Sequence, residues 1–205
     1  MIQPIRKQED RENMFMYLEK QNPRDAIMFV LGTHVGLRAS DLLQLKAGDF
    51  RKTITHDLVE KKTKKNSTLY VNQSIFNKYI KPYIADMDDN EYLFQSRKGY
   101  NKPIVPVQAY RILRDAGKAI KLPYKIGSHT MRKTFGYILY QQTRDIELVK
   151  ICLNHSSIHT TERYIGLNEE MRQRGFEELQ EAVNRPMKNF ENKYRKHKKG
   201  KELEG

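Results

Sequence analysis

The chain has 205 residues and carries 38 Lys or Arg against 25 Asp or Glu, which gives a formal net charge of +13. Such an excess of positive charge favours a polyanionic partner, with nucleic acid ahead of an anionic membrane surface. The longest apolar run, Ala26–Leu31, is too short to cross a bilayer, and the single Cys152 excludes an internal disulfide.

Two helices are predicted near the N-terminus. The first spans Asp10–Lys20. Its residues Met14, Tyr17 and Leu18 fall on one face, as in a helix that packs on a core. The second is predicted to begin at Pro23, a residue that suits the first helical turn.

The second helix should be buried throughout, because Ala26–Leu31 is apolar all round. Gly36 is expected to end it, and Ser40 is a natural N-cap for a short leucine-rich helix that follows. Arg38 then lies in the tight connection between two helices.

Residues 53–71 predict a small antiparallel β-hairpin. Strand-forming residues flank a polar turn of sequence KKTKKN at positions 61–66. The lysines of such a turn are solvated and provide general affinity for a phosphate backbone.

Helical periodicity dominates the rest of the chain, with a short extended piece at Tyr92–Phe94. The further helices are expected at about 74–85, 107–120, 129–142, 145–153 and 169–184. The sequence therefore predicts a mainly α domain with a small antiparallel β-sheet, an α+β fold.

The composition changes at residue 186. Residues 186–205 hold seven Lys or Arg and three Glu, a net charge of +4, which leaves +9 on residues 1–185. We expect a basic, disordered tail that is not the sole source of the positive charge.

No cofactor or metal is predicted. One cysteine and scattered histidines offer no zinc-ligand spacing, and the carboxylates are scattered as well. The first ten residues lack the apolar stretch of a secretory signal, so a cytoplasmic protein that acts on DNA, without a membrane partner, is expected.

Two segments carry groups that suit a phosphate. In GLRASDLLQL, Arg38 offers a planar guanidinium that matches two phosphate oxygens, although it could instead pair with Asp41. In SHTMRKTFGYILY, His129 and Arg132 share one face of a helix that Ser128 can cap, and a helix N-terminus attracts phosphate.

A third segment, CLNHSSIHTTERYIG, adds a histidine and a tyrosine. A helix is expected to end at Leu153, Asn154 can adopt the left-handed conformation that follows, and His155 comes next. Tyr164 lies nine residues later, although it is one of 12 tyrosines and most tyrosines are structural.

Together, GLRASDLLQL, HTMR and LNHSSIHTTERYIG resemble the ordered boxes of the tyrosine recombinase, or phage integrase, family. The resemblance covers roughly residues 5–185 and implies the family's catalytic-domain fold over residues 1–185. Relatives usually carry a further N-terminal core-binding domain, which is expected to be absent from this chain.

The resemblance also implies the roles of the site residues. Arg38 and Arg132 would clamp the scissile phosphate, and Tyr164 would attack it. His129 and His155 would support the reaction, with His129 as the favoured general base.

The lysine of the hairpin turn is assigned less directly. We prefer Lys62, because the family commonly places its lysine before Thr or Gly, and Lys64 is the alternative. Two departures from the family pattern are Asn154 in place of the usual Gly and Lys133 after Arg132. Lys133 is expected about 100° round the helix from Arg132.

The implied function is that of a site-specific DNA recombinase that cleaves and rejoins strands through a 3′-phosphotyrosine. The resemblance implies that the partner is double-stranded DNA and that the protein self-associates as a tetramer on paired sites. The alternatives are a non-catalytic DNA-binding accessory protein and a type IB topoisomerase-like enzyme.

The apolar face of helix 169–184, which includes Phe176 and Leu179, should pack on its own domain or on a neighbouring protomer.

Overall fold

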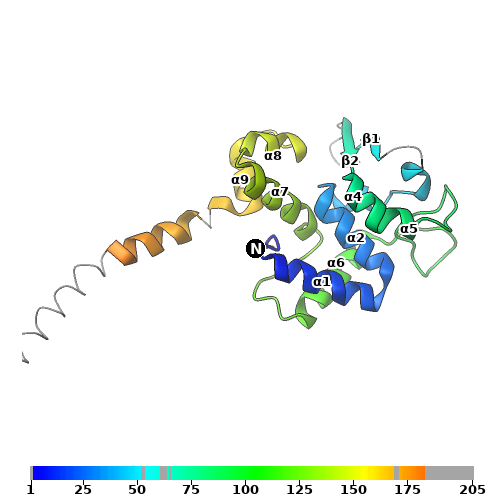
Figure 1. The fold of residues 1–205 in the computed structure, drawn as a ribbon, viewed down its shortest axis with the longest axis horizontal. Helices are drawn as coiled ribbons and strands as arrows, with labels where there is room; N and C mark the ends of the chain where they lie inside the picture. Colours follow the sequence, from blue (N-terminus) through cyan, green and yellow to red (C-terminus); the bar gives the residue numbers. More distant parts are fainter. Residues whose placement is uncertain (1, 52–53, 61–63, 65, 169–170, 183–205) are drawn as a thin grey trace, which may run out of the picture. The chain divides into compact units, whose positions relative to one another are not determined.

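Figure 1 shows the computed structural model, which describes residues 2–51, 54–60, 64, 66–168 and 171–182. The chain divides into two compact units, residues 1–165 and 166–205. The elements of the first unit are α1 (Gln8–Gln21), α2 (Pro23–His34), α3 (Ala39–Leu42), η1 (Ala47–Phe50), β1 (Thr55–Val59), β2 (Asn66–Tyr70), α4 (Gln73–Ile75), η2 (Phe76–Ile80), α5 (Lys81–Tyr83), α6 (Pro106–Ala119), α7 (Thr130–Thr143), α8 (Ile146–Cys152) and α9 (Ile158–Ile165). The predicted α+β fold, mainly α with one small antiparallel sheet, is confirmed.

Helix α2 forms the centre of the first unit, and every residue from Asp25 to Thr33 is buried. The side chain of Asn22 caps it by accepting a hydrogen bond from the N–H of Arg24 at 3.0 Å. Helix α7 packs closely on α2, because a Cβ at Gly32 would lie only 2.5 Å from Sδ of Met131. The helix predicted to be apolar all round is therefore the buried helix on which the others pack.

The core draws on distant parts of the chain, which explains why the hairpin and the N-terminal segment are fixed to the helices. Its largest fully buried side chains are Ile5, Met14, Leu18, Met28, Leu31, Leu42, Leu43, Phe50, Leu69, Ile80, Leu93 and Phe94.

The end of α2 follows the prediction. Gly36 has a φ of +66°, a left-handed conformation that glycine adopts at no steric cost. The ring of Phe135 lies so close that a Cβ at this position would come within 2.5 Å of it. Gly36 therefore both ends the helix and admits a side chain from α7.

Helix α3 begins two residues earlier than predicted, at Ala39. The carbonyl of Arg38 accepts the N–H groups of Asp41 and Leu42, each at 2.9 Å, so that Arg38 itself occupies the N-cap position. Ser40 lies in the first turn and does not cap the helix, which corrects the prediction.

The predicted hairpin is present. Strands β1 and β2 pair antiparallel, with Thr55 opposite Tyr70 and Val59 opposite Asn66. Leu69 is buried, whereas its neighbour Tyr70 is 69% exposed, as expected when one face of a sheet covers a core. The turn residues 61–63 and 65 lie outside the described part of the chain.

Two regions differ from the sequence prediction. The extended piece at Tyr92–Phe94 is reduced to an isolated bridge between Tyr92 and Lys46, followed by a turn. Helix α9 was not predicted, because it is only eight residues long and one of its two buried residues, Thr161, is polar. In the second unit residues 171–182 are helical, and Phe176 and Leu179 are exposed.

Candidate active site

Helix α7 presents His129 at its N-terminus. The helix begins at Thr130, with His129 in the N-cap position, so the predicted cap, Ser128, lies outside it. The reason is a local network in which Oγ1 of Thr130 accepts the N–H of Gly127 at 2.9 Å and donates to the carbonyl of Gln3 at 3.1 Å.

Arg132, one turn into α7, is buried and held at two points. Its guanidinium donates hydrogen bonds to the carbonyls of Gly36 and Leu153, which follow α2 and α8 respectively. Burial lowers the pKa of Arg132, yet an arginine stays protonated. Three segments of the chain thus meet around one fixed positive charge.

Arg38 forms an ion pair with Glu60, the residue that follows β1. The side chain of Glu60 is 1% exposed and that of Arg38 17%. The two arginines are near enough for the charge of Arg38 to lower the pKa of Arg132, while Glu60 raises it. Two guanidinium groups and one carboxylate therefore form a single electrostatic cluster.

Tyr164 lies on α9, which is anchored by its buried face. Thr161 and Ile165 are fully buried there, and Ile165 approaches α7 at Gly136, where a Cβ would lie 2.8 Å from its Cγ2. This packing leaves Tyr164 with its hydroxyl 3.4 Å from Nδ1 of His129, within hydrogen-bond reach.

Burial raises the pKa of the Tyr164 hydroxyl, because a phenolate loses solvation there. The charges of Arg132 and Arg38, and a hydrogen bond from Arg132, act in the opposite direction. The hydroxyl thus lies among positive charges and remains protonated without a base.

His155 also contacts Tyr164. Its ring lies 5.0 Å from the Tyr164 ring, centroid to centroid, at an interplanar angle of 83°. Nδ1 of His155 is 3.2 Å from Oγ1 of Thr161, and its backbone N–H donates to the carbonyl of Lys150. Asn154, just before it, has a φ of +50°, so the predicted left-handed residue is present.

The hairpin lysines are only partly described. Lys62 lies outside the described residues. Lys64, the alternative, has a φ of +56°, is exposed and donates its N–H to the carbonyl of Glu60 at 2.9 Å. Glu60 therefore contacts both Arg38 and the lysine turn.

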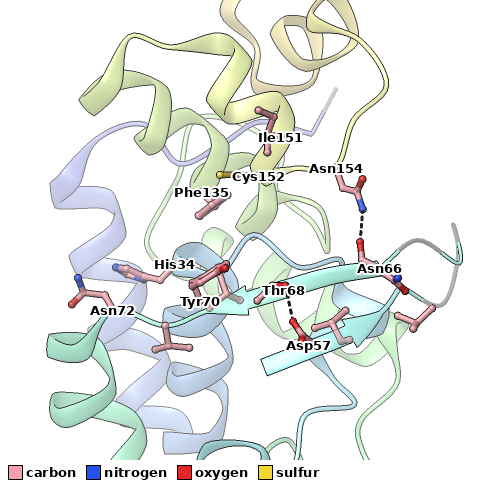
Figure 2. Close-up of a pocket in the computed structure, with 14 residues that line it drawn as sticks. His34, Asp57, Asn66, Thr68, Tyr70, Asn72, Phe135, Ile151, Cys152 and Asn154 are labelled. Atoms are coloured by element: carbon pink, nitrogen blue, oxygen red, sulfur yellow. Dashed lines mark hydrogen bonds between the residues drawn. The ribbon is translucent and has the colours of Figure 1, made fainter. Parts of the chain in front are cut away.

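A cavity of about 1060 Å³ lies between the hairpin and helices α7 and α8 (Figure 2). One wall carries Asn66 and Tyr70, and the other carries Phe135 and Asn154. Nδ2 of Asn154 donates to the carbonyl of Asn66 at 3.4 Å, so the position where the family usually has Gly links the two walls.

The structure brings together five of the six predicted residues: Arg38, His129, Arg132, His155 and Tyr164. Sequence reasoning missed Glu60, which has no pattern to distinguish it from other strand-end acids. It also assigned Lys133 to another side of α7, although its Nζ lies 5.0 Å from the Tyr164 ring centroid.

The described ranges contain neither a candidate metal site nor a candidate membrane span. No group of three or more His, Cys, Asp or Glu side chains there could hold a metal ion. None of the helices in those ranges is long and apolar enough to cross a membrane.

Known sequences that resemble this chain include proteins named as integrases and tyrosine recombinases. The probable integrase/recombinase YoeC of Bacillus subtilis is 44% identical over 170 residues, which cover 83% of this chain and 92% of that protein. The tyrosine recombinase XerA of Pyrococcus furiosus is 29% identical over 77% of this chain and 55% of its own length. The chain thus spans nearly all of the first relative and about half of the second.

Solved structures share the fold. A crystal structure of XerA recombinase superposes with a TM-score of 0.64 at 20% identity, covering 85% of this chain and 66% of that one. XerH bound to a palindromic difH substrate, in a post-cleavage complex, gives 0.63 at 22% identity over 77% and 48%. The sequence also matches the model of the phage integrase family over residues 6–171. The chain therefore belongs to the phage integrase family, the tyrosine site-specific recombinases.

Proposed function

We propose that Tyr164 is the nucleophile with which this recombinase cleaves DNA, forming a 3′-phosphotyrosine. The observation that carries the proposal is the 3.4 Å approach of the Tyr164 hydroxyl to His129 beside the guanidinium groups of Arg132 and Arg38. In the reaction the tyrosine oxygen bonds to phosphorus and the bond to the 5′ oxygen breaks.

Arg38 and Arg132 clamp the scissile phosphate in this proposal. Negative charge grows on the phosphate oxygens as the tyrosine attacks, and fixed cations lower the energy of that state. Arg132 is anchored by two carbonyls and Arg38 by Glu60, so neither has to reorganise far to meet the phosphate.

His129 and His155 have different roles at the attacking tyrosine. The raised pKa of Tyr164 means that its hydroxyl needs a base, and Nδ1 of His129 lies within hydrogen-bond reach of it. His155 is edge-on to the tyrosine ring and supports a phosphate oxygen.

The 5′ oxygen leaves with a proton from the hairpin lysine. We assign this role to Lys62, with Lys64 as the alternative. A 5′-bridging phosphorothiolate substrate separates the two, because a thiolate leaves without a proton. The variant at the true donor, Lys62→Ala or Lys64→Ala, should cleave an ordinary phosphate slowly and the sulfur substrate at the wild-type rate.

The nucleophile is tested with a nicked suicide duplex that traps the covalent adduct on a denaturing gel. Wild-type protein should form the adduct, and Tyr164→Phe should not, while its DNA affinity stays unchanged. An adduct with Tyr164→Phe would contradict the assignment. A wild-type protein that binds but never forms an adduct would indicate the accessory-protein alternative.

We further propose that the partner is double-stranded DNA and that protomers assemble as a tetramer on paired sites, in the cytoplasm. The net charge of +13 and the DNA-bound complexes of XerH support DNA as the partner. Sedimentation of the protein with duplexes that carry one or two sites measures the assembly. Site-independent relaxation of supercoiled plasmid by a monomer would instead favour the topoisomerase-like alternative.

A further inference from the structure

Helix α7 directs a third basic side chain toward the site, next to His129 and Arg132. Lys133 is 8% exposed, an unusual degree of burial for a lysine. Burial lowers the pKa of its ammonium, and the like charge of Arg6 lowers it further. A favourable contact is needed to retain such a cation inside the domain.

That contact is the ring of Tyr164. Nζ of Lys133 lies 5.0 Å from the ring centroid, within the range of a cation–π interaction. Within the described residues, no carboxylate pairs with Lys133. Its charge is therefore directed at the aromatic ring of the proposed nucleophile.

The surroundings of Lys133 are fixed from the other side by the N-terminal segment. The N–H of Ile5 donates to Oγ1 of Thr134 at 2.9 Å, and the guanidinium of Arg6 lies over the ring of Tyr137 at 5.5 Å. These contacts fix the N-terminal segment against α7 next to Lys133, a residue that is 8% exposed.

We propose that Lys133 is a positioning residue for Tyr164, resting on the proposed role of Tyr164 as the nucleophile. Its ammonium holds the tyrosine ring so that the hydroxyl lies beside His129. The ring becomes more negative as the hydroxyl loses its proton, so the contact strengthens during the attack.

A direct contact between Lys133 and a DNA phosphate is the competing role, and the two make different predictions. A phosphate contact contributes to DNA affinity and to its salt dependence. A positioning contact leaves both unchanged and lowers the rate of cleavage by bound protein. Replacement by methionine keeps a long unbranched side chain, one atom shorter than lysine, and removes the ammonium group with its charge.

The experiment measures single-turnover cleavage of the nicked suicide duplex at saturating protein, across pH, for wild type, Lys133→Met and Lys133→Arg. Lys133→Met should cleave about tenfold to thirtyfold more slowly, since a desolvated cation–π contact is of that size. Its pH–rate profile should move to higher pH. Lys133→Arg, which keeps the cation, should stay within about threefold of wild type.

Lys118→Met is the matched control, because it removes one exposed lysine charge from α6. Thermal unfolding of Lys133→Met verifies the fold, and burial of a methionine should leave the midpoint unchanged or raised. Wild-type cleavage by Lys133→Met, or a loss confined to DNA affinity, would overturn the proposal. Absence of an adduct with wild-type protein would instead refute the nucleophile itself, and the role of Lys133 with it.

Discussion

Arg38 and Glu60 form an ion pair that joins the connection between α2 and α3 to the end of β1. The carboxylate is 1% exposed and has lost almost all of its water, so the guanidinium replaces that solvation. The pair holds Arg38 in place, and it also holds Glu60, after which the lysine turn begins.

Glu60→Gln should therefore destabilise the protein, because it leaves the Arg38 charge poorly compensated while the shape is kept. We expect a loss of about 1–3 kcal/mol in the free energy of unfolding, measured by denaturant titration. Cleavage should fall as well, since the lysine turn loses its anchor. Asp57→Asn, in the exposed part of β1, is the control and should change neither quantity appreciably. Equal stability of Glu60→Gln and wild type would contradict this view of the pair.

Gly136 sets the distance between α7 and α9. A Cβ there would lie 2.8 Å from Ile165 and 3.0 Å from Leu153, so Gly136→Ala should push α9, and Tyr164 with it, away from His129. We expect a loss of about 1–3 kcal/mol of stability and a marked loss of cleavage.

Gly175→Ala provides the contrast for Gly136→Ala. Residue 175 is helical, and a Cβ there meets no atom within 4 Å. Helix propensity should then make the substitution neutral or stabilising by up to about 1 kcal/mol, with wild-type cleavage. Similar effects of both alanines would argue against close packing at Gly136.

Arg132→Lys should not preserve function, although it preserves charge. The guanidinium reaches two carbonyls at once, those of Gly36 and Leu153, and a single ammonium cannot reproduce that fork. We expect cleavage to fall about 10²-fold or more at saturating DNA, as when a transition-state donor is removed. The unfolding midpoint should also drop. A variant with more than a tenth of wild-type activity would refute the need for the fork.

Stability at high pH should depend on Tyr83. Burial raises the pKa of its hydroxyl to about 12, with opposing contributions from Arg24, which lowers it, and Asp25, which raises it. Above the ordinary pKa of about 10 the unfolded chain loses this proton while the folded protein keeps it, so the free energy of unfolding falls as pH rises from 10 to 12.

Tyr83→Phe should weaken that alkaline dependence. The variant loses the hydrogen bond to the carbonyl of Leu93, at 2.7 Å, and should be about 1 kcal/mol less stable at pH 9. Tyr124, whose pKa burial also raises to about 12, leaves a residual slope. Denaturant titrations at pH 9, 10.5 and 11.5 measure the slopes, and Tyr100→Phe, at a 94% exposed position, is the control. Identical slopes for Tyr83→Phe and wild type would contradict the prediction.

The arrangement of Tyr164 with Arg38 and Arg132 in one chain predicts that each protomer cleaves with its own tyrosine. A mixture of Tyr164→Phe with Arg38→Ala should then remain inactive on the suicide duplex. If the tyrosine acted on a neighbour's site, some assemblies in the mixture would regain an intact site, and adduct would reappear. The adduct yield of the mixture, relative to wild type, distinguishes the two cases.

Local patterns in the sequence determined most of the elements, although not α9, and most of the site. All-round apolarity identified α2, strand formers flanking a lysine turn identified the hairpin, and three short segments identified Arg38, His129, Arg132, His155 and Tyr164. Each of these patterns depends on neighbours in the chain, whose spacing is fixed by helix and strand geometry.

Only the tertiary structure decided which of these groups meet, and through which partners. Glu60 pairs with Arg38 across 22 positions of sequence, and α9 takes its place from packing at Gly136. Lys133 reaches Tyr164 because its long side chain extends into the space that its neighbours leave. Helical periodicity alone does not predict where the end of such a side chain lies. Contacts of this kind depend on burial and side-chain volume summed over distant segments, which no local spacing contains.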